Sequence, residues 1–388
     1  MIGFLTHPHH RYTQVFDWLL RWFPEPPQIH YGDSAGLEGF VEKAEAGTFD
    51  AVCLFQLDAC LPYLATQTKV ICCPMYDASR NRPADFFPTG ENILYVNMCR
   101  RLHQSISAQG GKSLYYQYAP DPKTLPTTDW GKPLRAHFWE REPGDMDRHG
   151  AEIIARRLGC KSLDFRLFRD KDLSFGSGEA QKKATEQWGS HVEHLKRIAE
   201  SQIFIAPRRF EGIGMAFLEA MAMGCVVVAE NQATANEYIL HGSTGLLYEG
   251  DGEKVRRPSE ISKAELNEIG LQARDHIEHL HRISQGMSQI IATKIREFLS
   301  RPKKTADRPD PILRKFCWDT QGRGLPVHAN KRYSTDFVYR NKRHEIEASR
   351  RRNLFLRIYE GLIRPKRVIA YFLRNLSRWA EQGAAKIK

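Results

Sequence analysis

A fifty-residue stretch, 201–250, constrains the fold of this chain more than any other segment. Two short apolar runs within it, 203–206 and 225–229, predict buried strands. Between them, Gly212 and Gly214 precede apolar residues at helical spacing, and a further glycine closes the predicted helix. Strand, glycine-containing turn, helix and strand make one βαβ unit of a parallel sheet, and such a turn usually faces a ligand.

Apolar and amphipathic segments alternate along most of the remaining chain, which predicts parallel α/β sheets. A stretch with four prolines, 119–133, interrupts the alternation and predicts an interdomain linker. We therefore expect two α/β domains, 1–130 and 131–300, and a C-terminal extension, 301–388. The other expected strands are 2–6, 28–31, 49–55, 69–73, 92–96, 114–118, 134–139 and 163–168, and the other expected helices are 12–23, 36–46, 99–107, 150–158, 191–200 and 262–299.

Composition excludes several classes of protein. The 388 residues include 41% hydrophobic and 11% aromatic residues, as in globular proteins. No apolar run approaches the roughly 18 residues that cross a bilayer, and the N-terminus lacks the pattern of a signal peptide. The eight cysteines are scattered, without the spacing of zinc ligands or of a disulfide framework. We therefore expect an intracellular protein with reduced thiols, located in the cytoplasm.

Positive charge is concentrated in the extension, where the segment from Arg301 onward holds 23 Lys and Arg against 8 Asp and Glu. An acidic partner is expected for it. The stretch 345–379 has apolar residues at helical spacing, with arginines on much of the remaining surface. The segment 345–388 therefore lies on an anionic membrane, packs on the body of the protein, or pairs in a homo-oligomer. We expect no nucleic-acid partner, because no binding module is present and the aromatics lie on the apolar stripes.

The run from Glu211 to Gly224 is EGIGMAFLEAMAMG, and it is followed by VVVA and, at 236–239, by NEYI. Two glutamates eight positions apart, with Gly-x-Gly after the first and Glu-Ala-Met-Ala-x-Gly from the second, form a specific pattern. The pattern resembles the signature of group 1 glycosyltransferases (family 4), closely over 201–250 and in outline from 1 to 299. The resemblance implies the GT-B architecture: two Rossmann-like domains, here an acceptor domain and a nucleotide-sugar donor domain, facing a cleft.

The physical chemistry of this run suits a donor site. A helix N-terminus presents free backbone N–H groups to a diphosphate, and glycines let the backbone approach it. Eight residues span about two helical turns, which places Glu211 and Glu219 on roughly the same face. By resemblance, Glu211 holds the donor sugar and Glu219 holds the ribose; alternatively, Glu211 only caps the helix and Glu219 is solvated. The residues expected to line the donor at the helix start are Gly212, Ile213, Gly214 and Met215.

Arginines are expected to face the diphosphate. The family often carries an Arg and a Lys after the first strand of the second domain, and here Arg141 is the first candidate while Arg148 stands where lysine is frequent. Arg208 and Arg209 lie close to the helix start. A fixed cation would stabilise the departing diphosphate, so we expect no metal and no other cofactor. Each arginine could instead be a solvated surface residue.

The same loop of the second domain contributes two further candidates. Glu237 matches a glutamate that the family frequently carries, and it could equally be a carboxylate at a helix N-terminus. Thr234 is expected to meet the donor from this loop.

The acceptor is expected at the carboxyl ends of the strands of the first domain. Asp77 follows the strand 69–73, and His7, His9 and His10 follow the strand 2–6. A side chain there could orient the acceptor hydroxyl or take its proton, so Asp77 joins Glu211 and Arg141 as a candidate catalytic residue. The resemblance implies a leaving phosphate that accepts the proton itself, in which case no protein base is required.

The sequence therefore predicts a nucleotide-sugar-dependent, retaining glycosyltransferase. We expect it to build a bacterial surface polysaccharide on a glycan or lipid-linked acceptor, peripherally at the inner face of the cytoplasmic membrane. Two other classes stay open. One is a nucleotide-sugar epimerase of the same architecture, which needs no acceptor. The other is a non-catalytic glycan- or nucleotide-binding relative, against which the intact Glu211 and Glu219 argue.

Overall fold

The computed structural model describes residues 1–8, 10–13, 15–80, 86–141, 145–167, 190–250 and 261–303. Within them the chain forms two parallel sheets, both in one compact unit, Met1–Gly324. The other unit, Leu325–Lys388, lies outside the described residues, and so do the helices expected at 345–379.

The first sheet has six strands in the order β2-β1-β3-β4-β5-β6, and all neighbouring strands are parallel. Four of them are buried along their whole length, as in a sheet covered by helices on both faces. The strands are β1 Ile2–Thr6, β2 Gln28–Tyr31, β3 Ala51–Phe55, β4 Lys69–Cys73, β5 Ile93–Asn97 and β6 Ser113–Tyr115. The helices of this part are α1 His10–Thr13, α2 Asp17–Leu20, α3 Ser34–Glu45, η1 Asp58–Cys60, α4 Leu61–Gln67, α5 Tyr76–Ser79, α6 Arg100–Ala108 and η3 Pro122–Thr124.

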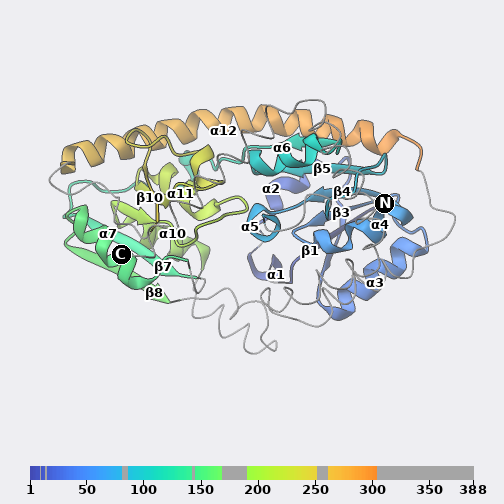
Figure 1. Ribbon diagram of the computed structural model, residues 1–388, viewed down its shortest axis with the longest axis horizontal. Helices are drawn as coiled ribbons and strands as arrows, with labels where there is room; N and C mark the ends of the chain where they lie inside the picture. The colour runs from blue at the N-terminus through green and yellow to red at the C-terminus, as the bar shows by residue number, and fades with distance from the viewer. Residues whose placement is uncertain are drawn as a thin grey trace, which may run out of the picture. The chain divides into compact units, whose positions relative to one another are not determined.

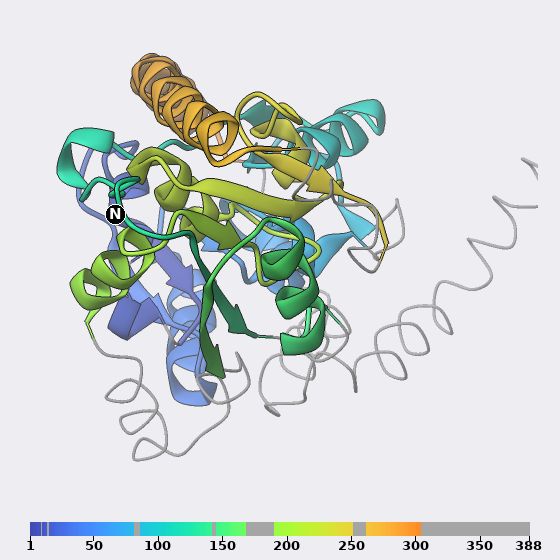
Figure 2. The same ribbon diagram turned by 90° about the vertical axis from the view of Figure 1, so that its left-hand side faces the viewer.

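The second sheet has five parallel strands in the order β11-β10-β9-β7-β8. Successive side chains of its strands alternate between two cores: Ile203 packs in the core that includes α7, and Phe204 in the core that includes α11 and α12. The helices α7 and α11 lie on opposite sides of the sheet (Figure 2). The elements are β7 Arg135–Glu140, α7 Arg148–Arg157, β8 Ser162–Leu167, α10 His191–Ala199, β9 Ile203–Ile205, α11 Met215–Met223, β10 Val226–Glu230, η4 Ala235–Glu237, β11 Leu246–Tyr248 and α12 Lys263–Ser300.

The long helix α12 runs alongside both sheets (Figure 1). It begins with a capping box, in which Ser262 and Glu265 satisfy each other's backbone N–H groups. Near its C-terminal end it contacts the first sheet's part of the chain, where Trp22 Nε1 donates to Ser288 Oγ at 2.8 Å and Lys69 Nζ donates to the Leu299 carbonyl. Among the helices that the structure describes, none combines the length and apolarity needed to span a bilayer.

One helix differs from the sequence-based expectation. The helix expected at 12–23 is two short helices, because Trp18 Nε1 donates to the Val15 carbonyl and the Leu19 N–H donates to Phe16 instead of Val15. The expected linker, 119–133, packs on the second sheet's helix α11. There Trp130 Nε1 donates to the Gly224 carbonyl at 3.1 Å, next to the C-terminus of α11.

The burial of α12 can be tested with a matched pair of isoleucines. Ile295 is fully buried, whereas Ile290, one and a half turns earlier, is 61% exposed. Ile295→Ala should lower the free energy of unfolding by about 2–5 kcal/mol, because it removes buried methyl groups and leaves a cavity. Ile290→Ala should change it by less than about 0.5 kcal/mol. Urea denaturation of both variants measures the difference, and equal losses would contradict the packing of this helix.

Candidate active site

The loop that opens α11 depends on two glycines. Gly214 has a φ of +80°, and a Cβ built on it would lie 1.9 Å from the ring of Phe217. A Cβ on Gly212 would lie 2.8 Å from the Met75 sulfur and 3.0 Å from a carboxylate oxygen of Asp77. Both positions therefore exclude larger residues. At Gly212 the close approach is to the α5 segment, which follows the first sheet's strand β4.

Four charged side chains meet beside this loop. Arg208 Nη1 lies 2.8 Å from Asp77 Oδ2 and 3.7 Å from Glu211 Oε2, and Arg141 Nη1 lies 4.0 Å from Glu211 Oε1. The four side chains are only 12–24% exposed, so solvent screens their interactions weakly. The structure thus brings together the three candidate catalytic residues and one candidate donor-binding arginine, each just after the carboxyl end of a strand.

The backbone of the loop is held by a buried threonine. Thr234 is fully buried, and its Oγ1 donates to the Glu211 carbonyl at 2.7 Å. Ile213 is buried in the core, and Met215 packs against it at the first position of α11. Thr234 therefore fixes the loop from within instead of presenting its hydroxyl to solvent.

Glu219 lies one turn along α11 and is buried. Its Oε1 is 3.2 Å from His191 Nε2, at the first residue of α10. The hydrogen bond to Glu219 raises the pKa of His191, although partial burial of the imidazole opposes the shift. The sequence did not single out His191.

Glu237 occupies a different place from the group around Glu211. Its carboxylate accepts hydrogen bonds from the backbone N–H of Arg100 at 2.8 Å and from the Tyr115 hydroxyl at 2.9 Å, and it lies 3.2 Å from Cys99 Sγ. It therefore sits at the N-terminus of α6, where a carboxylate complements the helix dipole. This is the alternative role considered for Glu237, acting on a helix of the first sheet's part of the chain. Its contact with a donor stays a prediction.

Arg148 also lies apart from the charged group. It is the first residue of α7, its Nε lies 2.7 Å from Glu152 one turn later, and its side chain is 61% exposed. The structure pairs Arg209 with Glu230 at 2.8 Å, at the end of β10. Among the acceptor-side histidines, His10 is buried, and burial lowers its pKa to about 3; His9 lies outside the described residues.

Sequence reasoning missed Asp145 beside the arginines. Burial raises the pKa of Asp145, while the charge of Arg208 is the largest effect that opposes the shift. Asp145 belongs to an Asp-x-Asp spacing with Asp147, a signal that could have been noticed as a possible cation site. The structure uses Asp147 as the N-cap of α7, where its carboxylate accepts from the Gly150 N–H at 2.8 Å. The described residues contain no group of three or more His, Cys, Asp or Glu side chains arranged to hold a metal ion.

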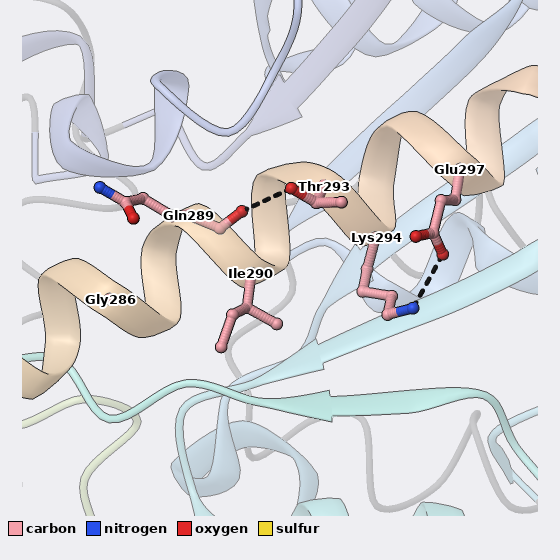
Figure 3. A pocket seen from close by; sticks show the side chains of 6 residues that line it. All are labelled: Gly286, Gln289, Ile290, Thr293, Lys294 and Glu297. Atoms are coloured by element: carbon pink, nitrogen blue, oxygen red, sulfur yellow. Dashed lines mark hydrogen bonds and ion pairs between the residues drawn. The ribbon is translucent and has the colours of Figure 1, made fainter.

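A hollow of about 430 Å³ lies elsewhere, along α12 (Figure 3). It shares no residue with the group around Glu211. The polar interactions drawn there stay within the helix, from Thr293 to the Gln289 carbonyl and from Lys294 to Glu297. We therefore place the candidate active site at the charged group, where four weakly exposed ionisable side chains from different segments converge. The hollow is lined by Gly286, Gln289, Ile290, Thr293, Lys294 and Glu297.

The family model described as "Glycosyl transferases group 1" matches residues 175–257. The matched segment contains the loop at Glu211, all of α11 and Glu237. The match confirms the resemblance that the two glutamates and the glycines indicated.

Solved structures show the fold. The chain is similar to Anabaena HepE in complex with UDP and glucose, with 14% identity, 75% of this chain and 99% of that chain covered, and a TM-score of 0.51. It is also similar to sucrose-phosphate synthase from Thermosynechococcus elongatus, with 12% identity, 69% and 79% coverage, and a TM-score of 0.50. These similarities confirm the α/β, GT-B architecture. No curated protein matches the chain in sequence.

The position of Glu237 gives a stability prediction. Glu237→Ala should lower the free energy of unfolding by about 1–3 kcal/mol, because it leaves the N–H groups at the start of α6 without their acceptor. Glu237→Gln keeps one acceptor oxygen and should lose less. The control is Glu38→Ala on the exposed face of α3. If chemical denaturation gives Glu237→Ala the same free energy of unfolding as this control, the contact of Glu237 with α6 is not made in solution.

Proposed function

We propose that the protein is a glycosyltransferase that moves a sugar from a nucleotide-diphosphate sugar to a glycan or lipid-linked acceptor, with retention of anomeric configuration. The observation that carries this proposal is the placement of Glu211 between Arg141 and Arg208, in the loop that leads into the helix bearing Glu219. The family match over this segment supports glycosyl transfer as the reaction class.

The donor half of the proposed site rests on the start of α11. Gly212 and Gly214 give a backbone without obstructing Cβ atoms, and the helix N-terminus adds partial positive charge. Arg141 and Arg208 supply two full positive charges at the same place. Glu219 would accept hydrogen bonds from the ribose hydroxyls. HepE, which has the same fold, binds UDP and glucose, so a uridine diphosphate sugar is the first donor to test.

The chemical step follows from this charge distribution. As the bond between the sugar and the diphosphate breaks, negative charge grows on the leaving phosphate oxygen, where fixed arginines stabilise it. The acceptor oxygen forms the new bond to the sugar, and its proton passes to the leaving phosphate. Asp77, which reaches Arg208 from the first sheet's part of the chain, would orient the acceptor hydroxyl. Because the arginines neutralise the diphosphate, the proposal includes no metal and no other cofactor.

The proposed biological setting is bacterial surface polysaccharide synthesis, with the protein peripheral at the inner face of the cytoplasmic membrane. This setting is supported by the basic, amphipathic sequence of 345–388 and by the role that is typical of the family which the chain resembles.

Two glutamine variants test the catalytic proposal. Glu211→Gln should lower the transfer rate by about 10²-fold or more, because it removes a charge that holds the donor sugar and the arginines in place. Glu219→Gln should weaken donor binding by about tenfold or more, since hydrogen bonds to charged groups contribute about 1.5–3 kcal/mol. Transfer and thermal shift are measured with a panel of nucleotide sugars. The exposed Glu268→Gln on α12 is the control and should behave as the wild type.

The same panel separates the alternatives. Near-normal transfer by Glu211→Gln would remove this residue from the site. A wild-type protein that neither binds nor turns over any nucleotide sugar would end the enzyme proposal. Conversion of the donor to its epimer without an acceptor would favour an epimerase.

The membrane setting has its own test. The full chain should float with liposomes that contain anionic lipid, and a chain ending at residue 344 should not, because it lacks the basic amphipathic segment. Neutral liposomes are the control and should recruit less of the full chain. Equal flotation of the two proteins would contradict the membrane role of this segment.

A further inference from the structure

His191 lies on the solvent side of a nearly buried carboxylate. Its imidazole Nε2 is 3.2 Å from Glu219 Oε1, and its side chain is 63% exposed, whereas the Glu219 side chain is 7% exposed. His191 begins α10 directly after the N-cap Ser190, so the backbone of a capped helix sets its position. The carboxylate thus has an imidazole at its exposed edge in the protein without a ligand.

The groups around His191 make Glu219 the charge that decides its protonation. On its own helix, His194 is buried, and burial lowers the pKa of His194 to about 2, so this neighbour stays neutral. Across from Glu219, burial and then the charge of Glu219 raise the pKa of Tyr118, so this phenol is also neutral. The start of α10 disfavours a cation, and Glu193 in the first turn offsets part of this effect. The hydrogen bond that His191 donates to Glu219 outweighs the partial burial of His191 and favours the imidazolium.

We propose that His191 is a proton-dependent positioning residue of the donor site. Its protonated imidazole binds the Glu219 carboxylate until a nucleotide sugar displaces the imidazole. This inference rests on the proposed function, because it takes Glu219 as the acceptor for the ribose hydroxyls. The imidazole binds Oε1 of the Glu219 carboxylate, and the ribose hydroxyls would need the same carboxylate. The ribose is neutral at every pH of interest, whereas the imidazole is a cation when protonated, so the competition for Glu219 depends on pH.

The direction of the pH dependence follows from linkage. In the free protein Glu219 keeps the proton on His191 up to a higher pH than in a complex where the ribose has taken the carboxylate. Donor binding therefore releases a proton, and affinity rises with pH through the titration range of the imidazole. Above that range His191 is neutral in both states, and the affinity becomes independent of this residue.

The experiment measures the dissociation constant of UDP-glucose by calorimetry from pH 5.5 to 8.5, or that of ADP-glucose or GDP-mannose if the panel selects one of these. The phosphates of such diesters do not titrate in this range, so proton release reports on the protein. For the wild type the dissociation constant should fall by up to about tenfold per pH unit in the steep part of the profile. His191→Gln should bind more tightly than the wild type at pH 6 and show a flatter profile. Both proteins should bind alike at pH 8.5.

A control variant and a second measurement make the result specific. His279→Gln removes an exposed histidine from α12 and should keep the wild-type profile, which excludes a general effect of histidine charge. Proton release in buffers of different ionisation enthalpy should be smaller for His191→Gln than for the wild type. Groups near the arginines, such as Asp145, contribute equally to both proteins, so the difference between the profiles isolates His191.

The outcomes separate this inference from the function on which it rests. If His191→Gln keeps the wild-type slope while Glu219→Gln loses donor affinity, the donor site stands and the role of His191 is overturned. If no nucleotide sugar binds the wild type, the proposed function falls and this inference with it.

Discussion

One guanidinium holds the candidate site together. Arg208 lies within ion-pair distance of Asp77, from the part of the chain that forms the first sheet, and of Glu211, from the part that forms the second. Two carboxylates this close would repel each other in a poorly solvated place, and a shared cation removes that cost. Arg141 lies on the other side of Glu211. The loop can therefore carry a carboxylate at a helix start, and a phosphate ligand would find cations there already fixed.

Further contacts reinforce this arrangement. Glu237 reaches the N-terminus of α6, and it stands three residues after Thr234, whose hydroxyl holds the Glu211 carbonyl. The segment after β10 thus supports the candidate site and also binds the part of the chain that forms the first sheet. The helix α12 also joins the two parts of the chain. Its Ser288 accepts a hydrogen bond from Trp22, while other residues of α12 pack on α11. Glu237, which the sequence predicted to bind the donor, connects the two parts of the chain in this structure.

The sequence predicted what depends on local pattern. Apolar runs located β1 and β4 to the residue, and Gly214 and Gly224 marked both ends of α11, because φ near +80° at these two caps favours glycine. The helix at 12–23 was wrong, since a tryptophan side chain takes a carbonyl that a continuous helix would use. The partners in the site could not be predicted: Glu237 and Arg100 are 137 residues apart, and no periodicity indicates that they meet. His191 was missed for the same reason, because its contact with Glu219 depends on how α10 packs beside α11.

The central claim is that the start of α11 and Glu219 together bind a nucleotide sugar. A crystal structure of the protein with UDP-glucose, or with the donor that the panel selects, tests it most directly. We predict the diphosphate within hydrogen-bond distance of the backbone N–H groups at 213–215 and of Arg141 or Arg208, with Glu219 bonded to the ribose. A nucleotide bound at another place, with Glu219 still paired to His191, would contradict the claim.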